Sequence, residues 1–169
     1  MTFLMQRENP AGSALPDAPI GSLLLGEQLC FALYAASRSV TQLYRPLLEE
    51  LGLTYPQYLV MLVLWERSAT LVRDLADLLQ LDYGTLSPLL KRLQAAGLLE
   101  RRRRTDDERL VQVTLTPAGQ ELKAHASAIP QQIVNAYGLT AQDFAALRAT
   151  LVRLTDSVTA SKEPTAADR

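Results

Sequence analysis

The chain has little of several residue types that proteins use for chemistry. Its 169 residues include one cysteine, one histidine and one tryptophan. A single cysteine cannot form a disulfide within the chain, so a disulfide would have to join two copies of the chain or join the chain to a small thiol. The sequence also has no metal-ligand cluster, no P-loop and no glycine-rich dinucleotide turn, and we therefore expect neither a metal nor another cofactor.

Long apolar segments are absent as well. No stretch approaches the roughly 18 apolar residues that a membrane span needs, and the opening MTFLMQREN lacks the continuous apolar region of a signal peptide. These absences predict a cytoplasmic protein with no membrane partner. With 48% apolar residues, 21% charged residues and a net charge of −1, the composition is that of an ordinary globular domain.

The chain does contain a local excess of positive charge. Six basic residues and one acid lie between Lys91 and Arg104, and Asp106, Asp107 and Glu108 follow directly. A basic patch on a nearly neutral protein indicates an anionic partner that binds at one place.

The first half of the sequence has the apolar periodicity of helices. Ser22 is expected to cap a long helix that is interrupted at Pro46 and closed at Gly52. Thr54 is expected to cap a second helix, YPQYLVMLVLWER, which is apolar on nearly all sides. This character predicts that the second helix is buried, with Trp65 in the core.

Two short helices and a hairpin follow. TLVRDLADLLQL has its apolar residues on one helical face, and LDYGTLSPLLKRLQAAGLL repeats the pattern, with Asp82 or Thr85 as its N-cap and Gly97 after its last turn. The apolar residues then alternate with polar ones: LLERRRR and RLVQVTLT flank TDDE, which predicts a two-stranded hairpin.

The remainder of the chain returns to helix. Thr116 is expected to cap a helix with Pro117 in its first turn and a kink at Pro130. A last helix opens at Thr140 and carries apolar residues at every third or fourth position, a stripe that predicts contact with a partner helix.

Two short helices followed by an arginine-rich hairpin make a winged helix-turn-helix, a DNA-binding arrangement. A run of arginines alone is often only a solvated face, and a pair of helices alone is common, but the order of these elements favours DNA binding. The start of the second helix would enter the major groove, and the arginines of the hairpin tip suit the more negative minor groove. The predicted DNA contacts are Tyr83, Thr85, Ser87, Lys91, Arg92, Arg102, Arg103, Arg104 and Arg109.

The predicted fold class is therefore mainly α with a small β-hairpin wing. We divide the chain into a flexible N-terminal arm (1–21), a helical dimerisation region (22–52 and 117–160), a winged helix-turn-helix DNA-binding domain (53–116) and a flexible C-terminal tail (161–169).

The segment from Leu71 to Gly119 resembles the MarR family of dimeric winged-helix regulators, above all in DYGTLSPLLKRLQAAGLLERRRRTDDERLVQVTLTPAG. Upstream, QLCFALYAASRSVTQLYRPLLEELGLTYPQYLVMLVLWE is similar to the OhrR-type branch, which senses organic hydroperoxides. The resemblance covers about residues 22 to 160 and leaves out the N-terminal arm. Its most specific residues are Cys30, Tyr44 and Tyr55, and the lone cysteine is that of the one-cysteine subgroup.

To react as a thiolate, Cys30 needs hydrogen-bond donors or positive charge near its sulfur. A helix that starts near Ser22 places Cys30 two turns inside, where the helix dipole has largely faded, and Glu27 would oppose ionisation. Tyr34, four residues on, can share its face. Tyr44 is 14 residues away, roughly 21 Å along a straight helix, so either that helix breaks or Tyr44 meets the cysteine of a second subunit.

The resemblance implies the second arrangement, with Tyr44 and Tyr55 donating hydrogen bonds to Cys30 across a homodimer. It also implies a repressor that binds a pseudo-palindromic operator in double-stranded DNA and releases it when an organic hydroperoxide oxidises Cys30 to a sulfenic acid. Because the chain has no resolving cysteine, a low-molecular-weight thiol would cap the oxidised sulfur, or the sulfur would be oxidised further.

Two other functions stay open at this point. The first is a MarR-type regulator that binds a phenolic or other small ligand, with Cys30 serving only as packing. The second is a thiol peroxidase, but such an enzyme would need a second cysteine, an arginine pair or a histidine base near the thiol. The only histidine, His125, is expected to be a solvated or capping residue of the C-terminal helices. We therefore expect a regulator and not an enzyme.

Overall fold

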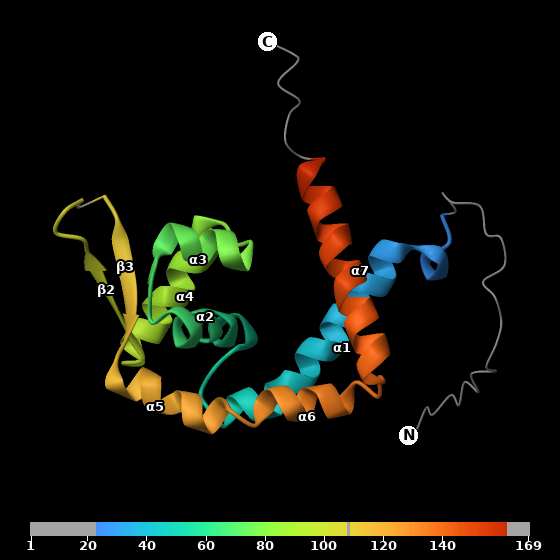
Figure 1. Ribbon diagram of the computed structural model, residues 1–169, viewed down its shortest axis with the longest axis horizontal. Coiled ribbons are helices and arrows are strands. Elements are labelled where there is room, and N and C mark those ends of the chain that lie inside the picture. Colours follow the sequence, from blue (N-terminus) through green and yellow to red (C-terminus); the bar gives the residue numbers. More distant parts are fainter. Residues whose placement is uncertain (1–22, 108, 162–169) are drawn as a thin grey trace, which may run out of the picture. The chain divides into compact units, whose positions relative to one another are not determined.

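The computed structural model describes residues 23–107 and 109–161 (Figure 1). This part of the chain is mainly helical with one small antiparallel sheet, which confirms the predicted fold class. Its elements are η1 (Leu25–Glu27), α1 (Leu29–Glu49), α2 (Tyr55–Arg67), β1 (Ala69–Leu71), α3 (Val72–Leu79), α4 (Tyr83–Ala95), β2 (Leu99–Arg103), β3 (Val111–Leu115), α5 (Pro117–Ala126), α6 (Ile129–Ala136) and α7 (Ala141–Ala160). None of these helices has the length and apolar character of a membrane span.

The described residues belong to two compact units, which divide between Thr41 and Gln42. Helix α1 contributes to both units. The predicted arm (1–21), the predicted cap Ser22 and the predicted tail after Ser161 lie outside the described residues.

Helix α1 begins later than the sequence pattern indicates. The prediction of a helix from Ser22 is wrong: Leu25–Glu27 form a single 3-10 turn, Gln28 is extended, and α1 begins at Leu29. Gly26 lies in the 3-10 turn, and glycine is a poor residue for the interior of an α-helix. The apolar pattern upstream of Leu29 therefore does not extend the helix.

Pro46 does not interrupt α1, and this prediction is also wrong. The helix runs through Pro46 to Glu49. The proline falls in the last turn, so its missing N–H removes only the backbone hydrogen bond to the carbonyl of Gln42. Gly52 closes the turn that follows Glu49, with a φ of 65° that glycine adopts without strain, in agreement with its predicted role.

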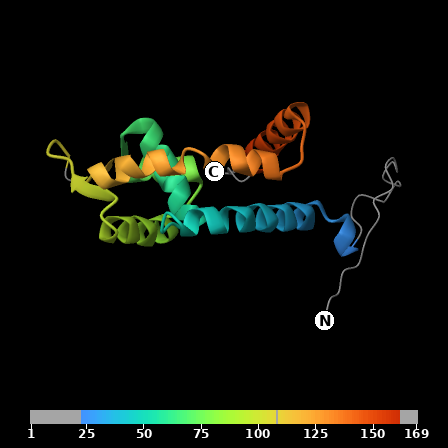
Figure 2. The same cartoon turned by 90° about the horizontal axis from the view of Figure 1, so that it is seen from below.

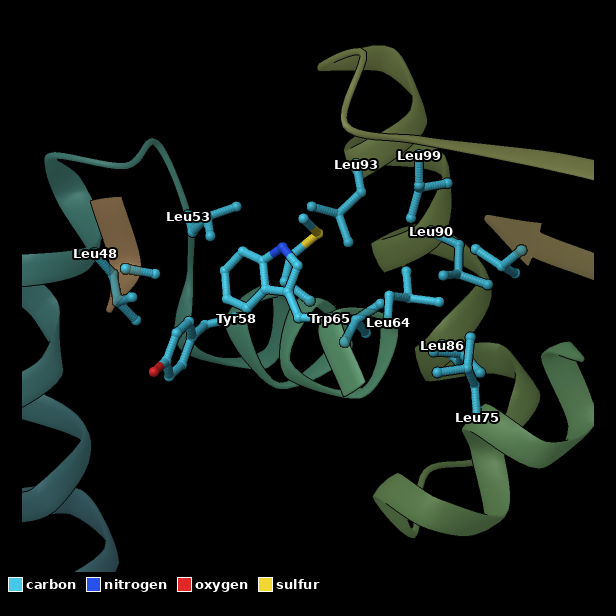
Figure 3. Close-up of a cluster of buried hydrophobic side chains, with 14 of the residues drawn as sticks. Leu48, Leu53, Tyr58, Leu64, Trp65, Leu75, Leu86, Leu90, Leu93 and Leu99 are labelled. Atoms are coloured by element: carbon cyan, nitrogen blue, oxygen red, sulfur yellow. The ribbon is translucent and has the colours of Figure 1, made fainter. Parts of the chain in front are cut away.

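The core of the second unit forms around α2, which packs against α3, α4 and the sheet (Figure 3). Thr54 caps α2 as predicted, in a capping box with Gln57. Trp65 is 8% exposed, and its indole N–H donates to the carbonyl of Gly119 in α5 at 2.9 Å, which confirms its place in the core. The residues that α3, α4 and the sheet contribute include Leu75, Leu86, Leu90, Leu93, Leu99 and Val113, all 0–1% exposed.

The sheet has three strands in the order β1-β3-β2, one more than the predicted hairpin. β2 and β3 form the predicted hairpin, with Leu99 opposite Leu115 and Arg103 opposite Val111. β1 adds a third strand on the other edge of β3. A three-residue strand is too short to show alternation, and the apolar residues that follow it match a helix, which is why the sequence pattern assigned residues 70 and 71 to helix.

The predicted kink at Pro130 is a complete break. α5 ends at Ala126 and α6 begins at Ile129, as Figure 2 shows in orange. In a continuous helix the ring of Pro130 would clash with the carbonyl of Ala126, four residues earlier. Ile129 and Ile133 fix α6 against the core, where they are 4% and 2% exposed.

Helix α7 leaves its apolar stripe uncovered in the single chain. Thr140 caps the helix as predicted, because its hydroxyl accepts a hydrogen bond from the N–H of Asp143 at 3.1 Å. No residue of α7 is buried, and Leu147, Leu151 and Val158 are 38–49% exposed. The stripe is thus free to contact a partner helix.

Thr70 in β1 carries the one buried side-chain oxygen without a hydrogen-bond partner among the described residues. The residue is 6% exposed and lies opposite Val113 of β3. We expect Thr70→Val to stabilise the protein by about 1 kcal/mol, because valine has the same shape and needs no partner. Urea unfolding at a fixed protein concentration measures this change. Thr114→Val, at a half-exposed position of β3, is the control, with an expected change below about 0.5 kcal/mol; a Thr70→Val protein less stable than the control would contradict the prediction.

Candidate functional site

The second short helix, α4, begins at Tyr83 with Asp82 as its N-cap. Asp82 accepts hydrogen bonds from both the N–H and the hydroxyl of Thr85, each at 2.8 Å. These bonds hold the pKa of the Asp82 carboxyl below its ordinary value. The carboxylate therefore fixes the start of the helix. The hydroxyl of Thr85, one of the predicted DNA contacts, already donates its hydrogen bond to this N-cap.

One face of α4 enters the core and another is exposed. Leu86, Leu89, Leu90 and Leu93 are its buried residues. Tyr83, Ser87 and Lys91 are exposed and spaced four residues apart, so they share one face of the helix. Arg92 beside them is exposed too. These four predicted contacts thus lie on the solvent side of the helix.

Two of the wing arginines pair with acids of the wing. Arg102 Nη2 lies 2.6 Å from Glu100 Oε2. Arg104 donates two hydrogen bonds to Asp106, from Nε to Oδ1 at 2.8 Å and from Nη2 to Oδ2 at 2.5 Å. The Arg104 guanidinium holds the pKa of the Asp106 carboxyl below its ordinary value. Arg104 therefore shapes the tip of the wing, and its guanidinium is occupied by an acid.

Arg103 and Arg109 differ from that pair. Both are exposed, and neither guanidinium forms an ion pair with another residue that the structure describes. The backbone N–H of Arg109 donates to Asp107 Oδ1 at 3.0 Å, which turns the chain at the tip. These two arginines are the wing residues most available to an anionic partner.

Arg101 connects the wing to α4. Its Nε donates to Gln94 Oε1 in the last turn of α4 at 2.7 Å. Arg101 lies in β2 opposite Val113. Nothing in the sequence indicates this contact, because the apolar pattern of a strand says nothing about the partner of an arginine.

Cys30 lies in the first turn of α1 and is exposed. The prediction that it lies two turns inside a helix is wrong, because α1 begins at Leu29. The first turn of an α-helix has unpaired backbone N–H groups and the positive end of the helix dipole, and both favour an anion. The argument that the helix dipole has faded at this residue therefore does not apply to Cys30.

Tyr34, the predicted neighbour of the thiol, has a different described partner. Its hydroxyl accepts a hydrogen bond from Arg38 Nη1 at 3.0 Å, and the Arg38 guanidinium lies 5.6 Å from the ring centroid. Tyr34 is 56% exposed. A role for Tyr34 at the sulfur stays a prediction.

Four tyrosines from three elements form a cluster in the second unit. The ring centroid of Tyr44 lies 4.8 Å from that of Tyr55 and 5.8 Å from that of Tyr58. Tyr137, which follows α6, is a further neighbour, because its phenol contributes to the raised pKa of the Tyr44 phenol. Burial raises the pKa of the Tyr44 and Tyr55 phenols, and the neighbouring phenols raise it further. Both phenols therefore keep their protons and remain hydrogen-bond donors.

The structure thus brings together Tyr44 and Tyr55, as predicted, and adds Tyr58 and Tyr137, which the sequence analysis did not assign to the site. Helix α1 is continuous from Leu29 to Glu49, so the alternative in which it breaks between Cys30 and Tyr44 is not observed. Four tyrosines lie between residues 34 and 58, and this density could have indicated that Tyr58 belongs to the cluster. No local sequence pattern connects Tyr137 with this segment.

His125 is exposed in the last turn of α5, in agreement with its predicted capping or solvated position. Within residues 23–107 and 109–161, no group of three or more His, Cys, Asp or Glu side chains could hold a metal ion.

Known proteins resemble this chain over most of its length. A family model described as transcriptional regulator SarA/Rot matches residues 42–126. The chain is 43% identical over 134 residues to the organic hydroperoxide resistance transcriptional regulator of Bacillus subtilis, and the match covers 79% of this chain and 91% of that protein.

Solved structures of AbfR, a protein of Staphylococcus epidermidis, are similar as well. Reduced AbfR bound to DNA is 34% identical with a TM-score of 0.67, and the match covers 80% of this chain and 94% of that chain. Disulfide-formed AbfR is 38% identical with a TM-score of 0.57, and the match covers 78% and 92%.

Proposed function

Because the chain belongs to the MarR family of winged-helix transcriptional regulators and to its OhrR-type branch, we propose that it is a homodimeric repressor that releases its operator when an organic hydroperoxide oxidises Cys30. The family makes it a DNA-binding regulator and not an enzyme. The observation that carries the sensing role is the exposed thiol in the first turn of α1, in a chain with no other cysteine.

The chemical step uses the sulfur of Cys30 as a nucleophile. The thiolate attacks the terminal oxygen of the hydroperoxide, an S–O bond forms, and the O–O bond breaks. The sulfur loses two electrons and becomes a sulfenic acid, while the departing alkoxide takes a proton and leaves as an alcohol. A low-molecular-weight thiol then displaces water from the sulfenic acid to give a mixed disulfide. Disulfide-formed AbfR supports the view that a related fold accommodates a disulfide.

Tyr44 and Tyr55 are proposed to donate hydrogen bonds to the thiolate of the partner subunit's Cys30. Their phenols are close together, protonated and partly buried, which suits donors to an anion. Within one helix, the 14 residues between Cys30 and Tyr44 keep these two side chains too far apart for contact. The cysteine of a second copy of the chain is not held at that distance. The uncovered stripe of α7 gives the two copies a surface on which to associate. An oxidised, enlarged sulfur would lose these hydrogen bonds and change the spacing of the two DNA-binding lobes.

The DNA surface is proposed to combine the exposed face of α4 with the wing. Tyr83, Ser87 and Lys91 would face the major groove, where a helix of this motif reads bases. Arg103 and Arg109 would reach the minor groove and the phosphates. The similarity to reduced AbfR bound to DNA supports DNA binding by this chain.

A mobility-shift assay with and without cumene hydroperoxide tests the proposed function. The reduced protein should retard operator DNA, and the treated protein should release it. A regulator that binds a small ligand without using the thiol would ignore the oxidant, and a thiol peroxidase would not retard the DNA. Mass spectrometry of the treated protein then identifies the group attached to the sulfur.

Arg109→Ala is expected to weaken operator binding by about tenfold and to reduce the slope of log affinity against log salt by about one. The reason is that one guanidinium without an internal partner is removed from the wing. Fluorescence anisotropy at several salt concentrations measures both quantities. Arg45→Ala is the matched control, since it removes an arginine that pairs with Glu49 on α1 at 2.8 Å; equal losses in the two variants would argue against a contact specific to the wing.

A further inference from the structure

The wing, formed by β2, β3 and the turn between them, leaves α4 through a short connection (Figure 1). Gly97, with a φ of 73°, follows the helix, and the backbone N–H of Leu98 donates to the carbonyl of Leu93 at 3.0 Å. Residues 96–98 thus connect the helix proposed to read the major groove with the hairpin proposed to reach the minor groove. The orientation of the wing relative to α4 depends on the contacts that span this connection.

The side chain of Arg101 spans the connection. Side chains alternate along a strand, so Arg101 lies on the same face of β2 as Leu99, which is 1% exposed in the core. Its Nε donates to Gln94 Oε1 in the last turn of α4 at 2.7 Å. Arg102 lies on the opposite face of the strand and pairs with Glu100. Of these two neighbouring arginines, Arg101 is the one that the strand directs toward the helix.

Gln94 belongs to the exposed face of α4 that is proposed to meet DNA. It is exposed and follows Lys91 by three residues, so it extends the row of Tyr83, Ser87 and Lys91. The guanidinium and the amide are both planar, and a hydrogen bond between them is directional. The bond of Arg101 therefore holds the wing in one orientation against the helical face itself.

Arg101 makes the outermost side-chain hydrogen bond between the wing and another described element. Farther toward the tip, in residues 102–107 and 109–111, the side-chain hydrogen bonds and ion pairs of the described chain have both partners within the wing. The pair of Arg104 and Asp106 is an example. The position of the tip relative to α4 thus depends on the bond of Arg101 and on the backbone pairing of the sheet.

We propose that Arg101 and Gln94 are positioning residues for DNA recognition. Their hydrogen bond braces the wing against α4, so that Arg109 reaches the minor groove while α4 occupies the major groove. This inference rests on the proposed function, because it assigns the pair to the same DNA surface. Without the bond, the wing of the free protein samples more orientations and has to be ordered when DNA binds, which lowers the affinity. Neither residue has to touch the DNA for this effect.

The test compares Gln94→Ala, Arg101→Ala and the double variant in the full-length reduced protein. The probe is an end-labelled duplex that the unmodified protein selects from a random-sequence pool. Fluorescence anisotropy measures affinity, hydroxyl-radical cleavage reports on the minor groove, and methylation of guanine N7 reports on the major groove. Each single variant should bind about threefold more weakly, because one hydrogen bond is lost. Gln94→Ala should lose protection of the minor groove and keep protection of the major groove.

Two combinations show whether the pair acts through the wing. The double variant should bind as Arg101→Ala does, because each substitution breaks the same bond. In an Arg109→Ala background, Gln94→Ala should change the affinity by less than about 1.5-fold, because the wing contact that the bond positions is already removed. Gln131→Ala is the matched control, since this exposed glutamine bonds to Asn135 within α6 at 2.9 Å. It should bind and protect the duplex as the unmodified protein does.

The possible results separate the inference from the function on which it rests. If Gln94→Ala binds and protects the duplex as the unmodified protein does, the bond does not position the wing, and the DNA-binding function stands. If the double variant is weaker by the product of the two single effects, the residues act independently of their bond and the inference is equally wrong. Loss of major-groove protection in Gln94→Ala would also overturn it. If the unmodified protein selects no duplex, the proposed function fails together with the inference.

Discussion

Replacement of Cys30 by serine is expected to abolish the release of operator DNA by organic hydroperoxides, while the affinity of the reduced protein changes by less than about twofold. A serine hydroxyl is not oxidised to an analogue of the sulfenic acid, so the chemical step has no substitute in the variant. The affinity should survive because Cys30 is exposed and lies in the first unit of the chain, whereas the predicted DNA contacts lie in the second. Mobility shifts before and after treatment with cumene hydroperoxide measure both effects.

A matched control separates the loss of the thiol from the presence of a new hydroxyl. Ala32→Ser places a serine on an exposed position of the same helix and keeps Cys30. This variant should release DNA as the unmodified sequence does. Release of DNA from the Cys30→Ser protein at the same peroxide concentration would falsify the proposed sensing role.

Gly119→Ala is expected to destabilise the protein by at least about 3 kcal/mol, the largest stability effect that we predict. A Cβ at this position would lie 1.9 Å from the carbonyl oxygen of Leu98 and 3.2 Å from Leu115 Cδ2. The carbonyl belongs to the backbone and accepts a hydrogen bond from the N–H of Thr116 at 3.1 Å, so it cannot rotate away. Helix α5 would have to shift from the start of β2, at the base of the wing.

Urea unfolding followed by circular dichroism measures the loss of stability. Gly26→Ala is the control, because a Cβ there meets nothing within 4 Å and the backbone has no positive φ. Its expected effect is below about 0.5 kcal/mol. A Gly119→Ala protein as stable as this control would mean that the contact with Leu98 relaxes at little cost.

Three threonine caps were correctly predicted, because a cap is a local interaction. Thr54, Thr116 and Thr140 were each expected to cap a helix, and each does. The hydroxyl of Thr116, for example, accepts from the N–H of Gly119 at 3.0 Å, three residues on. Such a motif can be predicted from the sequence, because all of its atoms belong to four consecutive residues.

The predictions failed mainly where the structure depends on contacts between residues that are far apart in the chain. Residues 69–71 form β1 only because β3, more than forty residues later, offers a free edge. The proximity of Tyr137 to Tyr44 depends on how the chain after α6 returns to the end of α1, and no periodicity in the sequence indicates this. The start of α1 was misplaced for another reason: a run of leucines before Leu29 imitates a helical face, although Gly26 lies within it.

The predicted DNA contacts divide in the same way. The sequence identified the exposed face of α4 and the arginines of the wing from spacing and charge. It did not distinguish Arg104, which is bound to Asp106, from Arg103, which has no ion-pair partner in the part of the chain that is described. The sequence does not distinguish an unpaired arginine from one that is paired with an acid, because the pairing depends on where the acid lies in the folded chain.

The environment of Trp65 has a spectroscopic consequence. It is the only tryptophan of the chain, its indole N–H donates to Gly119, and its carbonyl accepts a hydrogen bond from Lys123 Nζ at 3.0 Å. Both partners come from α5, so the fluorescence of this tryptophan reports on the contact between α2 and α5. The protein therefore contains an intrinsic fluorophore where α2 contacts α5, the helix that follows the wing. No label has to be attached to observe this contact.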